Sequence, residues 1–241
     1  MIEGVVIEPM TREFILWRCL HGGPITREAV DQPEPHPSIP WTQLRARNVP
    51  LLSELTDVYG ACALIAWHSE RIVGQLRFYP KAVCQMAAPG PGLCMQQTFP
   101  GGPADDLVDK TFPPLDLIDD KTLFVHCMMT GSPQQQENPY QRKCLGTRMV
   151  RTLIQWAKAK GWEHIEAHAF EDIPIVYEIT GGAGHTFWEK IGFHVAERHP
   201  HPYLQSRDEF VVTLEEEAAA LGIPPEKAKE QFIMRLDLTQ T

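Results

Sequence analysis

The sequence lacks the features that mark secreted, zinc-stabilised or membrane-spanning proteins. None of its six cysteines forms a CxxC pair, and most lie within apolar segments, as is typical of reduced core thiols. The strongest apolar run, ACALIAW at 61–67, is far too short to span a bilayer. The N-terminus MIEGVVIEPM has no basic region followed by a long apolar stretch. These absences predict a soluble, cytoplasmic protein without a membrane partner.

Positive charge and metal-ligand patterns are also scarce. A formal net charge of −9 argues against a non-specific nucleic-acid surface, so no nucleic-acid partner is expected. His164 and His168 would share a face only on a helix, whereas HIEAHAF alternates like a strand, and no metal site is predicted. The chain contains neither GxGxxG nor GxxxxGK[ST], which argues against dinucleotide-binding and P-loop folds.

The composition is that of an ordinary globular protein. With 43% hydrophobic residues in 241, the chain can bury a core as one large domain or two small ones. Because no repeat or linker is evident, we predict a single α/β domain over 1–241 with a mixed sheet. It carries a Pro/Gly-rich insertion around 84–122 and a helical insertion around 213–230. The first insertion is either a functional lid or interaction loop, or a wandering surface segment.

Hydrophobic periodicity predicts the order of the elements along the chain. FILWRCLHGG (14–23) is apolar and aromatic enough for a strand. Residues 41–60 have leucines at helical spacing with a kink or break at Pro50, and 62–80 form a hairpin around the turn HSER. Further strands are expected at 121–130, 162–170, 193–200 and 232–238.

The helix that begins near residue 145 is the clearest element. Leu145, Met149 and Leu153 recur every fourth residue, and Gly161 marks the expected stop. The stretch YQRKCLG (140–146) therefore joins a buried strand to a helix N-terminus, where unpaired backbone N–H groups and a partial positive charge favour a phosphate. On its own, YQRKCLG is either a phosphate cradle or a basic turn.

Two segments carry a resemblance to a known family. YQRKCLG is similar to the Gln/Arg-x-x-Gly-x-Gly/Ala pyrophosphate loop of the GNAT superfamily of acyl-coenzyme A-dependent N-acetyltransferases, with Cys144 where the first glycine is usual. HTFWEKIGF (185–193) resembles the family's FYEKLGF segment, in which a helix packs beside the coenzyme. The resemblance implies a mixed, mostly antiparallel central sheet flanked by helices, with a splayed pair of strands at 121–130 and 162–170.

The resemblance also implies which residues bind acetyl-coenzyme A. Backbone donors of the loop would hold the pyrophosphate, and the strand ending at 127–129 would pair with the pantetheine and offer an N–H to the thioester carbonyl. Met128 and Met129 are otherwise ordinary core residues. We expect negative φ at Cys144, because it lies in the first turn of a helix. The implied coenzyme residues are Cys127, Met128, Met129, Gln141, Arg142, Lys143, Cys144, Leu145, Gly146, Thr147, Phe187 and Lys190.

The catalytic groups are less marked in the sequence. An alkyl ammonium must lose a proton before it attacks a thioester, which a nearby carboxylate can assist. Glu171 and Asp172, with His126 behind them, are the candidate bases, although the acidic pair also reads as a solvated turn. Trp188 stands where the family often has a tyrosine acid and cannot protonate a thiolate. Water, Tyr203 or Tyr177 remains as the proton donor.

The resemblance implies an acyltransferase that passes the acetyl group directly from acetyl-coenzyme A to a primary amine, with no metal. A non-catalytic acyl-coenzyme A-binding regulatory protein of the same fold is the alternative, and a structural interaction module comes third. A small amine, an amino acid, an antibiotic or a protein N-terminus all remain open as acceptor. The late helix and exposed strand edges leave room for a homodimer.

Overall fold

The computed structural model describes residues 2–18, 20, 25–33, 41–87, 114–131, 138–180, 182–205 and 208–239. The chain divides into two compact units, Met1–Gly161 and Trp162–Thr241. The single domain expected over 1–241 stays a prediction, and each unit is described by itself.

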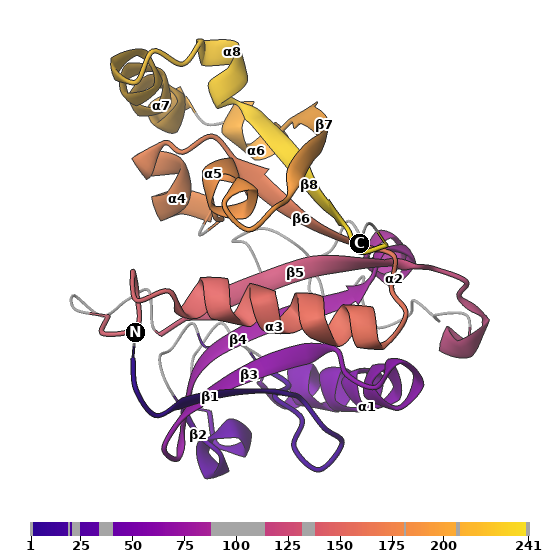
Figure 1. The fold of residues 1–241 in the computed structure, drawn as a ribbon. Helices are drawn as coiled ribbons and strands as arrows, with labels where there is room; N and C mark the ends of the chain where they lie inside the picture. The colour runs from indigo at the N-terminus through magenta and orange to yellow at the C-terminus, as the bar shows by residue number, and fades with distance from the viewer. Residues whose placement is uncertain are drawn as a thin grey trace. The chain divides into compact units, whose positions relative to one another are not determined.

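The first unit is built on antiparallel strands in the order β1-β3-β4-β5, with β2 paired to β4 (Figure 1). The hairpin predicted at 62–80 is confirmed as β3 and β4, which pair His68 with Arg71 around the turn at 69–70. The unit's elements are β1 (Val5–Pro9), β2 (Ile25–Thr26), η1 (Glu28–Asp31), α1 (Trp41–Tyr59), β3 (Ala63–His68), β4 (Arg71–Pro80), α2 (Lys81–Ala87), η3 (Leu115–Leu117), β5 (Thr122–Thr130) and α3 (Leu145–Ala159).

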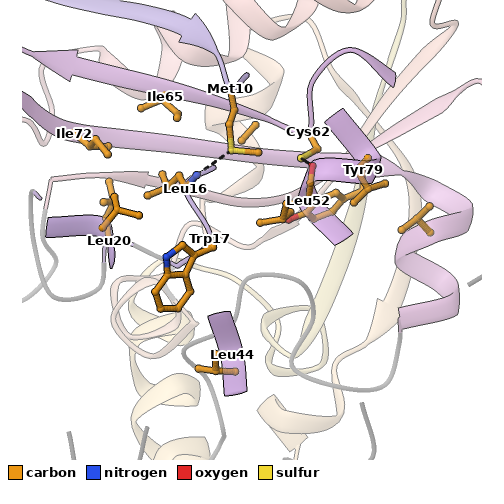
Figure 2. Close-up of a cluster of buried hydrophobic side chains, with 14 of the residues drawn as sticks. Met10, Leu16, Trp17, Leu20, Leu44, Leu52, Cys62, Ile65, Ile72 and Tyr79 are labelled. Carbon is orange, nitrogen blue, oxygen red and sulfur yellow. Dashed lines mark hydrogen bonds between the residues drawn. The ribbon is translucent and has the colours of Figure 1, made fainter. Parts of the chain in front are cut away.

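A cluster of buried side chains joins α1 to one face of these strands (Figure 2). Leu52 and Leu55 of α1 are fully buried in it with Ile65 of β3 and Tyr79 of β4. The helix predicted at 41–60 is confirmed, and it continues through Pro50 to Tyr59 without the break that the proline suggested. Burial of the leucines after Pro50 offsets the backbone hydrogen bond that proline removes.

The predicted strand at 14–23 is wrong for the residues of it that the structure describes. Leu16, Trp17 and Leu20 are buried in the same cluster, but their segment has no strand ladder. The carbonyls of Leu16 and Arg18 instead accept hydrogen bonds from the buried guanidinium of Arg77, at 2.6 and 3.1 Å. A side chain thus satisfies backbone groups that a strand would have paired, which lets an apolar segment be buried in irregular form.

Helix α3 covers the opposite face of the strands, alongside β4 and β5 (Figure 1). Met149 and Leu153 are fully buried, as the four-residue spacing predicted. Gly74 of β4 permits the close approach, because a Cβ there would lie 3.2 Å from the sulfur of Met149. Phe78 contacts Trp156 at a ring separation of 4.9 Å. The strand predicted at 121–130 is also confirmed, as β5.

The second unit has antiparallel strands in the order β6-β8-β7 and a small core of its own. Its core lies between α4 and α7, with Phe170, Leu204 and Leu214 among its buried residues. The strands predicted at 162–170, 193–200 and 232–238 are confirmed. The region expected to be a helical insertion, around 213–230, holds most of α7 and all of α8, and its status as an insertion stays a prediction. The elements are β6 (His164–Phe170), α4 (Pro174–Thr180), α5 (His185–Glu189), β7 (His194–Pro200), α6 (Pro202–Gln205), α7 (Asp208–Ala220), α8 (Pro225–Ala228) and β8 (Glu230–Asp237).

The predicted mixed fold with mostly antiparallel pairing and flanking helices is confirmed. Of the Pro/Gly-rich insertion at 84–122, residues 88–113 lie outside the described part, while its flanks hold the end of α2 and the short η3. No helix within the described ranges is both long enough and apolar enough to cross a membrane.

Candidate functional site

The loop that leads into α3 is held by the side chain of Asn138. Its Nδ2 donates to the carbonyl of Thr130 at the end of β5 at 2.8 Å, and its Oδ1 accepts from the N–H of Tyr140 at 3.0 Å. The carbonyl of Asn138 also accepts from the N–H of Gln141 at 3.2 Å. Gly131 makes room for this arrangement, since a Cβ there would overlap the Asn138 amide. Asn138 therefore joins the end of β5 to the start of the loop.

Cys144 has a left-handed backbone, with φ 62° and ψ 14°, so the expectation of a negative φ is wrong. It is the residue that caps α3 rather than the first helical residue, and a cap has non-helical dihedrals. Arg142 is left-handed too, at φ 53°. Such a conformation costs about 1 to 2 kcal/mol in a residue with a Cβ. Glycine would adopt this conformation without that cost, so Cys144 adds backbone strain to the loop.

The loop and the start of α3 fit an anionic ligand. Arg142, Lys143 and Cys144 are exposed, so their backbone and the two basic side chains are accessible. Leu145 is buried and anchors the first turn of a 15-residue helix, while Gly146 and Thr147 are partly exposed beside it. The first N–H groups of a helix this long are unpaired and carry partial positive charge. This arrangement suits a phosphate or pyrophosphate group.

Strand β5 has an irregularity at His126. The register pairs Arg77 with Cys127 but Phe78 with Val125, so it shifts at His126, the extra residue of β5 at this point. A bulge of this kind interrupts the ladder, increases the local twist and re-aims the neighbouring groups. The bulge lies directly before 127–129, the segment that sequence resemblance assigned to the thioester and pantetheine.

Polar side chains of β4 lie buried beside the bulge, and the sequence analysis missed them. Gln75 and Arg77 lie directly opposite Met129 and Cys127 in the strand register. Their side chains therefore lie on the same face of the sheet as those of Met129 and Cys127. The Nε2 of Gln75 lies 3.8 Å from the sulfur of Cys127. Tyr79 contacts the His126 ring at 5.7 Å. The signal was available, because polar groups at alternate positions 75, 77 and 79 of an apolar strand are unusual in a core.

The second motif is built around a buried tryptophan. Trp188 is 2% exposed and contacts Phe187 and Phe193, with ring separations of 5.2 and 5.0 Å. It is therefore a core residue of the second unit. Phe187 is partly exposed and Lys190 is exposed. Of the alternative proton donors, Tyr177 is 53% exposed, and the side chain of Tyr203 lies outside the described part.

The candidate bases Glu171 and Asp172 gather around His185 of α5. The Nε2 of His185 lies 3.4 Å from Glu171 Oε2 and 3.5 Å from Asp172 Oδ2, and its Nδ1 lies 3.1 Å from Glu189 Oε1. Asp172 also accepts a hydrogen bond from the N–H of Thr186 at 3.3 Å and so caps α5. Both carboxylates thus contact His185, which the sequence analysis did not name, while Asp172 itself is exposed.

The described cysteines differ in their surroundings, although all four are free. Burial raises the pKa of the Cys62 thiol to about 11. Burial, together with the carboxylate of Asp120, raises the pKa of Cys84 to about 12. Cys144 is exposed and Cys127 partly so. Within the described ranges, no group of three or more His, Cys, Asp or Glu residues is placed to hold a metal ion.

In comparisons by sequence, no protein-family model and no curated protein matches the chain. Solved structures do resemble it. One from Desulfovibrio desulfuricans, provisionally assigned to the GNAT family of acetyltransferases, has 12% identity and a TM-score of 0.44 over 98% of this chain and 99% of its own. The ribosomal-protein-S18-alanine N-acetyltransferase of Escherichia coli has 9% identity and a TM-score of 0.45 over 98% and 96%. A Bacillus subtilis acetyltransferase in complex with coenzyme A has 15% identity and a TM-score of 0.38 over 73% and 75%.

The chain is similar to these three acetyltransferase structures, one of them assigned to the GNAT family. At 9 to 15% identity, the similarity concerns the fold and not the acceptor or the reaction.

Proposed function

We propose that this protein is an N-acetyltransferase that transfers the acetyl group of acetyl-coenzyme A directly to a primary amine. The observation that carries the proposal is the combination, within the first unit, of a bulged strand at His126 and an exposed basic loop at the start of α3. The loop supplies donors for a pyrophosphate, and the bulge changes the direction of the β5 backbone beside the place where a thioester would lie.

In this proposal the backbone near Cys127 donates to the thioester oxygen as the amine attacks. Negative charge develops on that oxygen, and a fixed N–H donor stabilises it without reorganising. The tetrahedral intermediate collapses by breaking the C–S bond, and the thiolate takes a proton from water or a nearby acid. The amine loses its proton to a base, and His126 is the candidate that lies in the same unit as the loop and β5.

The involvement of Glu171 and Asp172 with His185 favours a structural role for that pair. Asp172 caps α5, and Glu171 faces the imidazole. His126 is the stronger candidate on position, because it is the bulge residue next to the proposed thioester site. Comparing His126→Gln with Glu171→Gln separates them, since only loss of the base should lower kcat more than it changes the KM for acetyl-coenzyme A.

The test is an acetyl-coenzyme A titration followed by a thiol-release screen over amines. Saturable binding with release of coenzyme A thiol in the presence of an amine supports the proposal. Ping-pong kinetics or a trapped acyl-cysteine would overturn direct transfer. The second candidate, a non-catalytic acyl-coenzyme A-binding protein, is favoured by the buried Trp188 in place of a tyrosine acid. It predicts binding without thiol release across the whole panel.

Alkylation of Cys144 gives a readout that needs no acceptor. Its thiol is exposed, whereas Cys62 is buried and Cys84 partly buried, both with raised pKa values, so these two should react slowly near pH 8. Bound coenzyme A should slow alkylation of the peptide that contains Cys144, as followed by mass spectrometry. Equal rates with and without coenzyme A would remove the loop from the binding site.

A further inference from the structure

Tyr140, the residue just before the loop's basic stretch, is fastened to a distant part of the first unit. Its hydroxyl forms a hydrogen bond of 3.0 Å with Nδ1 of His68, which lies 72 residues earlier in the chain. The two rings also meet edge to face, with centroids 5.9 Å apart and planes at 84°. His68 is the last residue of β3, so the contact links the loop to the tip of the β3–β4 hairpin.

Other contacts keep both partners in place. Asn138 holds the backbone of Tyr140, and a Cβ on Gly4 would lie 3.6 Å from the His68 ring, which places the N-terminal turn against it. Beyond the loop, the guanidinium of Arg148 in α3 donates to the carbonyl of Val5 in β1 at 2.8 Å. The loop is therefore braced at Tyr140 before its exposed segment and at Arg148 after it.

Between these two braces lie the left-handed residues Arg142 and Cys144. A strained conformation persists only where the surroundings enforce it. The exposed residues 142–144 make few packing contacts, so the enforcement must come from the residues on either side. On the side towards β5, Tyr140 forms a side-chain hydrogen bond to another element two residues before Arg142.

We propose that Tyr140 is a positioning residue for the coenzyme loop, acting through its hydrogen bond to His68. The inference rests on the proposed function, because it assumes that the loop binds the pyrophosphate of coenzyme A. The bond holds the loop in the conformation that directs its N–H groups toward the anion, so the ligand need not order the loop when it binds. Tyr140 itself contacts no reacting atom.

This role makes a prediction specific to one part of the ligand. Loss of the bond should weaken binding of coenzyme A, which contains the pyrophosphate, and leave binding of pantetheine, which lacks it, unchanged. A residue that merely stabilises the fold would affect both ligands alike, or neither until the protein unfolds.

The experiment compares Tyr140→Phe with wild type in the full-length chain. Dissociation constants for coenzyme A are measured by isothermal titration calorimetry, and those for pantetheine by its competition with the alkylation of Cys127. We expect coenzyme A to bind about five- to tenfold more weakly, the usual effect of one lost hydrogen bond, with pantetheine within about twofold. Tyr59→Phe is the matched control, because it removes a hydroxyl bonded to the carbonyl of Leu115 at 2.7 Å elsewhere in the same unit.

Variants of the partner sharpen the result. His68→Leu should weaken the binding of coenzyme A as much as Tyr140→Phe does. The double variant should lose no further affinity, because both substitutions remove the same hydrogen bond. His68→Asn, which keeps a hydrogen-bonding group, should recover part of the affinity. Additive losses would contradict a shared bond.

Failure of the inference is distinguishable from failure of the proposed function. If wild type does not bind coenzyme A, the proposed function fails and the inference with it. If wild type binds and Tyr140→Phe binds equally well, the inference alone is overturned. It is also overturned if Tyr140→Phe weakens the binding of coenzyme A and the binding of pantetheine by the same factor.

Discussion

Two glycines, one in each unit, both leave room for a neighbouring side chain, but their backbone conformations differ. A Cβ at Gly131 would overlap the amide of Asn138, and a Cβ at Gly184 would overlap the carboxylate of Asp172. In each case the side chain so admitted holds a motif in place, the loop before α3 or the first turn of α5. Gly131, however, is left-handed at φ +67°, whereas Gly184 has an ordinary φ of −65°.

The difference in φ shows that the two positions require glycine for different reasons. Gly184 is required only for space, and a modest shift of Asp172 would relieve a substitution. Gly131 is required for space and for backbone conformation, and no movement of Asn138 relieves the second. The loop of the first unit should therefore be the less tolerant of the two, and the following variants test that ranking.

Gly131→Ala should have the largest effect. We expect a loss of about 2 to 4 kcal/mol in the free energy of unfolding, since strain and the displacement of Asn138 add together. Urea denaturation measures it. Gly161→Ala is the control, because Gly161 has φ +78° with nothing near its Cβ position and so reports strain alone. Equal losses in the two variants would show that Asn138 is not displaced. Gly131→Ala should also weaken the binding of coenzyme A, whereas Gly161→Ala should leave that binding unchanged.

Gly184→Ala should cost less, about 1 kcal/mol, because it loses the bond from Thr186 to Asp172 without backbone strain. Asp172→Ala removes the same bond from the other side, and the double variant should cost little more than either single change. Thermal unfolding monitored by circular dichroism provides the values. A loss larger than that of Gly131→Ala would reverse the ranking of the two glycines.

Cys144→Gly should have the smallest effect, and of opposite sign. Relief of the left-handed strain contributes about 1 to 2 kcal/mol, and the extra freedom of glycine in the unfolded chain offsets about 0.5 to 1. We expect a gain of up to about 1 kcal/mol in the free energy of unfolding by urea. Lys143→Gly, at a neighbour without positive φ, should instead lose stability. If Cys144→Gly and Lys143→Gly lower the free energy of unfolding equally, the left-handed conformation of Cys144 does not reduce stability.

Periodicity within one segment predicted most of the architecture. Helix α3 followed from the spacing of Leu145, Met149 and Leu153, because a helix places every fourth residue on one face. The hairpin of β3 and β4 followed from two apolar runs around a polar turn. The strand expected at 14–23 failed because the same apolar content can be buried irregularly when Arg77, far along the chain, satisfies its carbonyls.

For the candidate site, the sequence likewise indicated the contiguous loop but not the contacts between distant residues. Residues 141–147 were named because a loop motif is contiguous and its element follows directly. The bulge at His126, the buried Gln75 and the His68–Tyr140 bond were not, since each depends on which residue of one strand lies opposite which residue of another. Register is a property of the assembled sheet, and a shift of one residue would change every such pair.

The sequence by itself determined the elements with a local cause: an amphipathic helix, a hairpin with a polar turn, and a basic loop at a helix N-terminus. Only the tertiary structure decided the backbone of Cys144, the engagement of Glu171 and Asp172 with His185, and the brace at Tyr140. The physical reason is range. Periodicity and capping act between residues a few positions apart, whereas strain, burial and long-range hydrogen bonds depend on partners that only folding brings together.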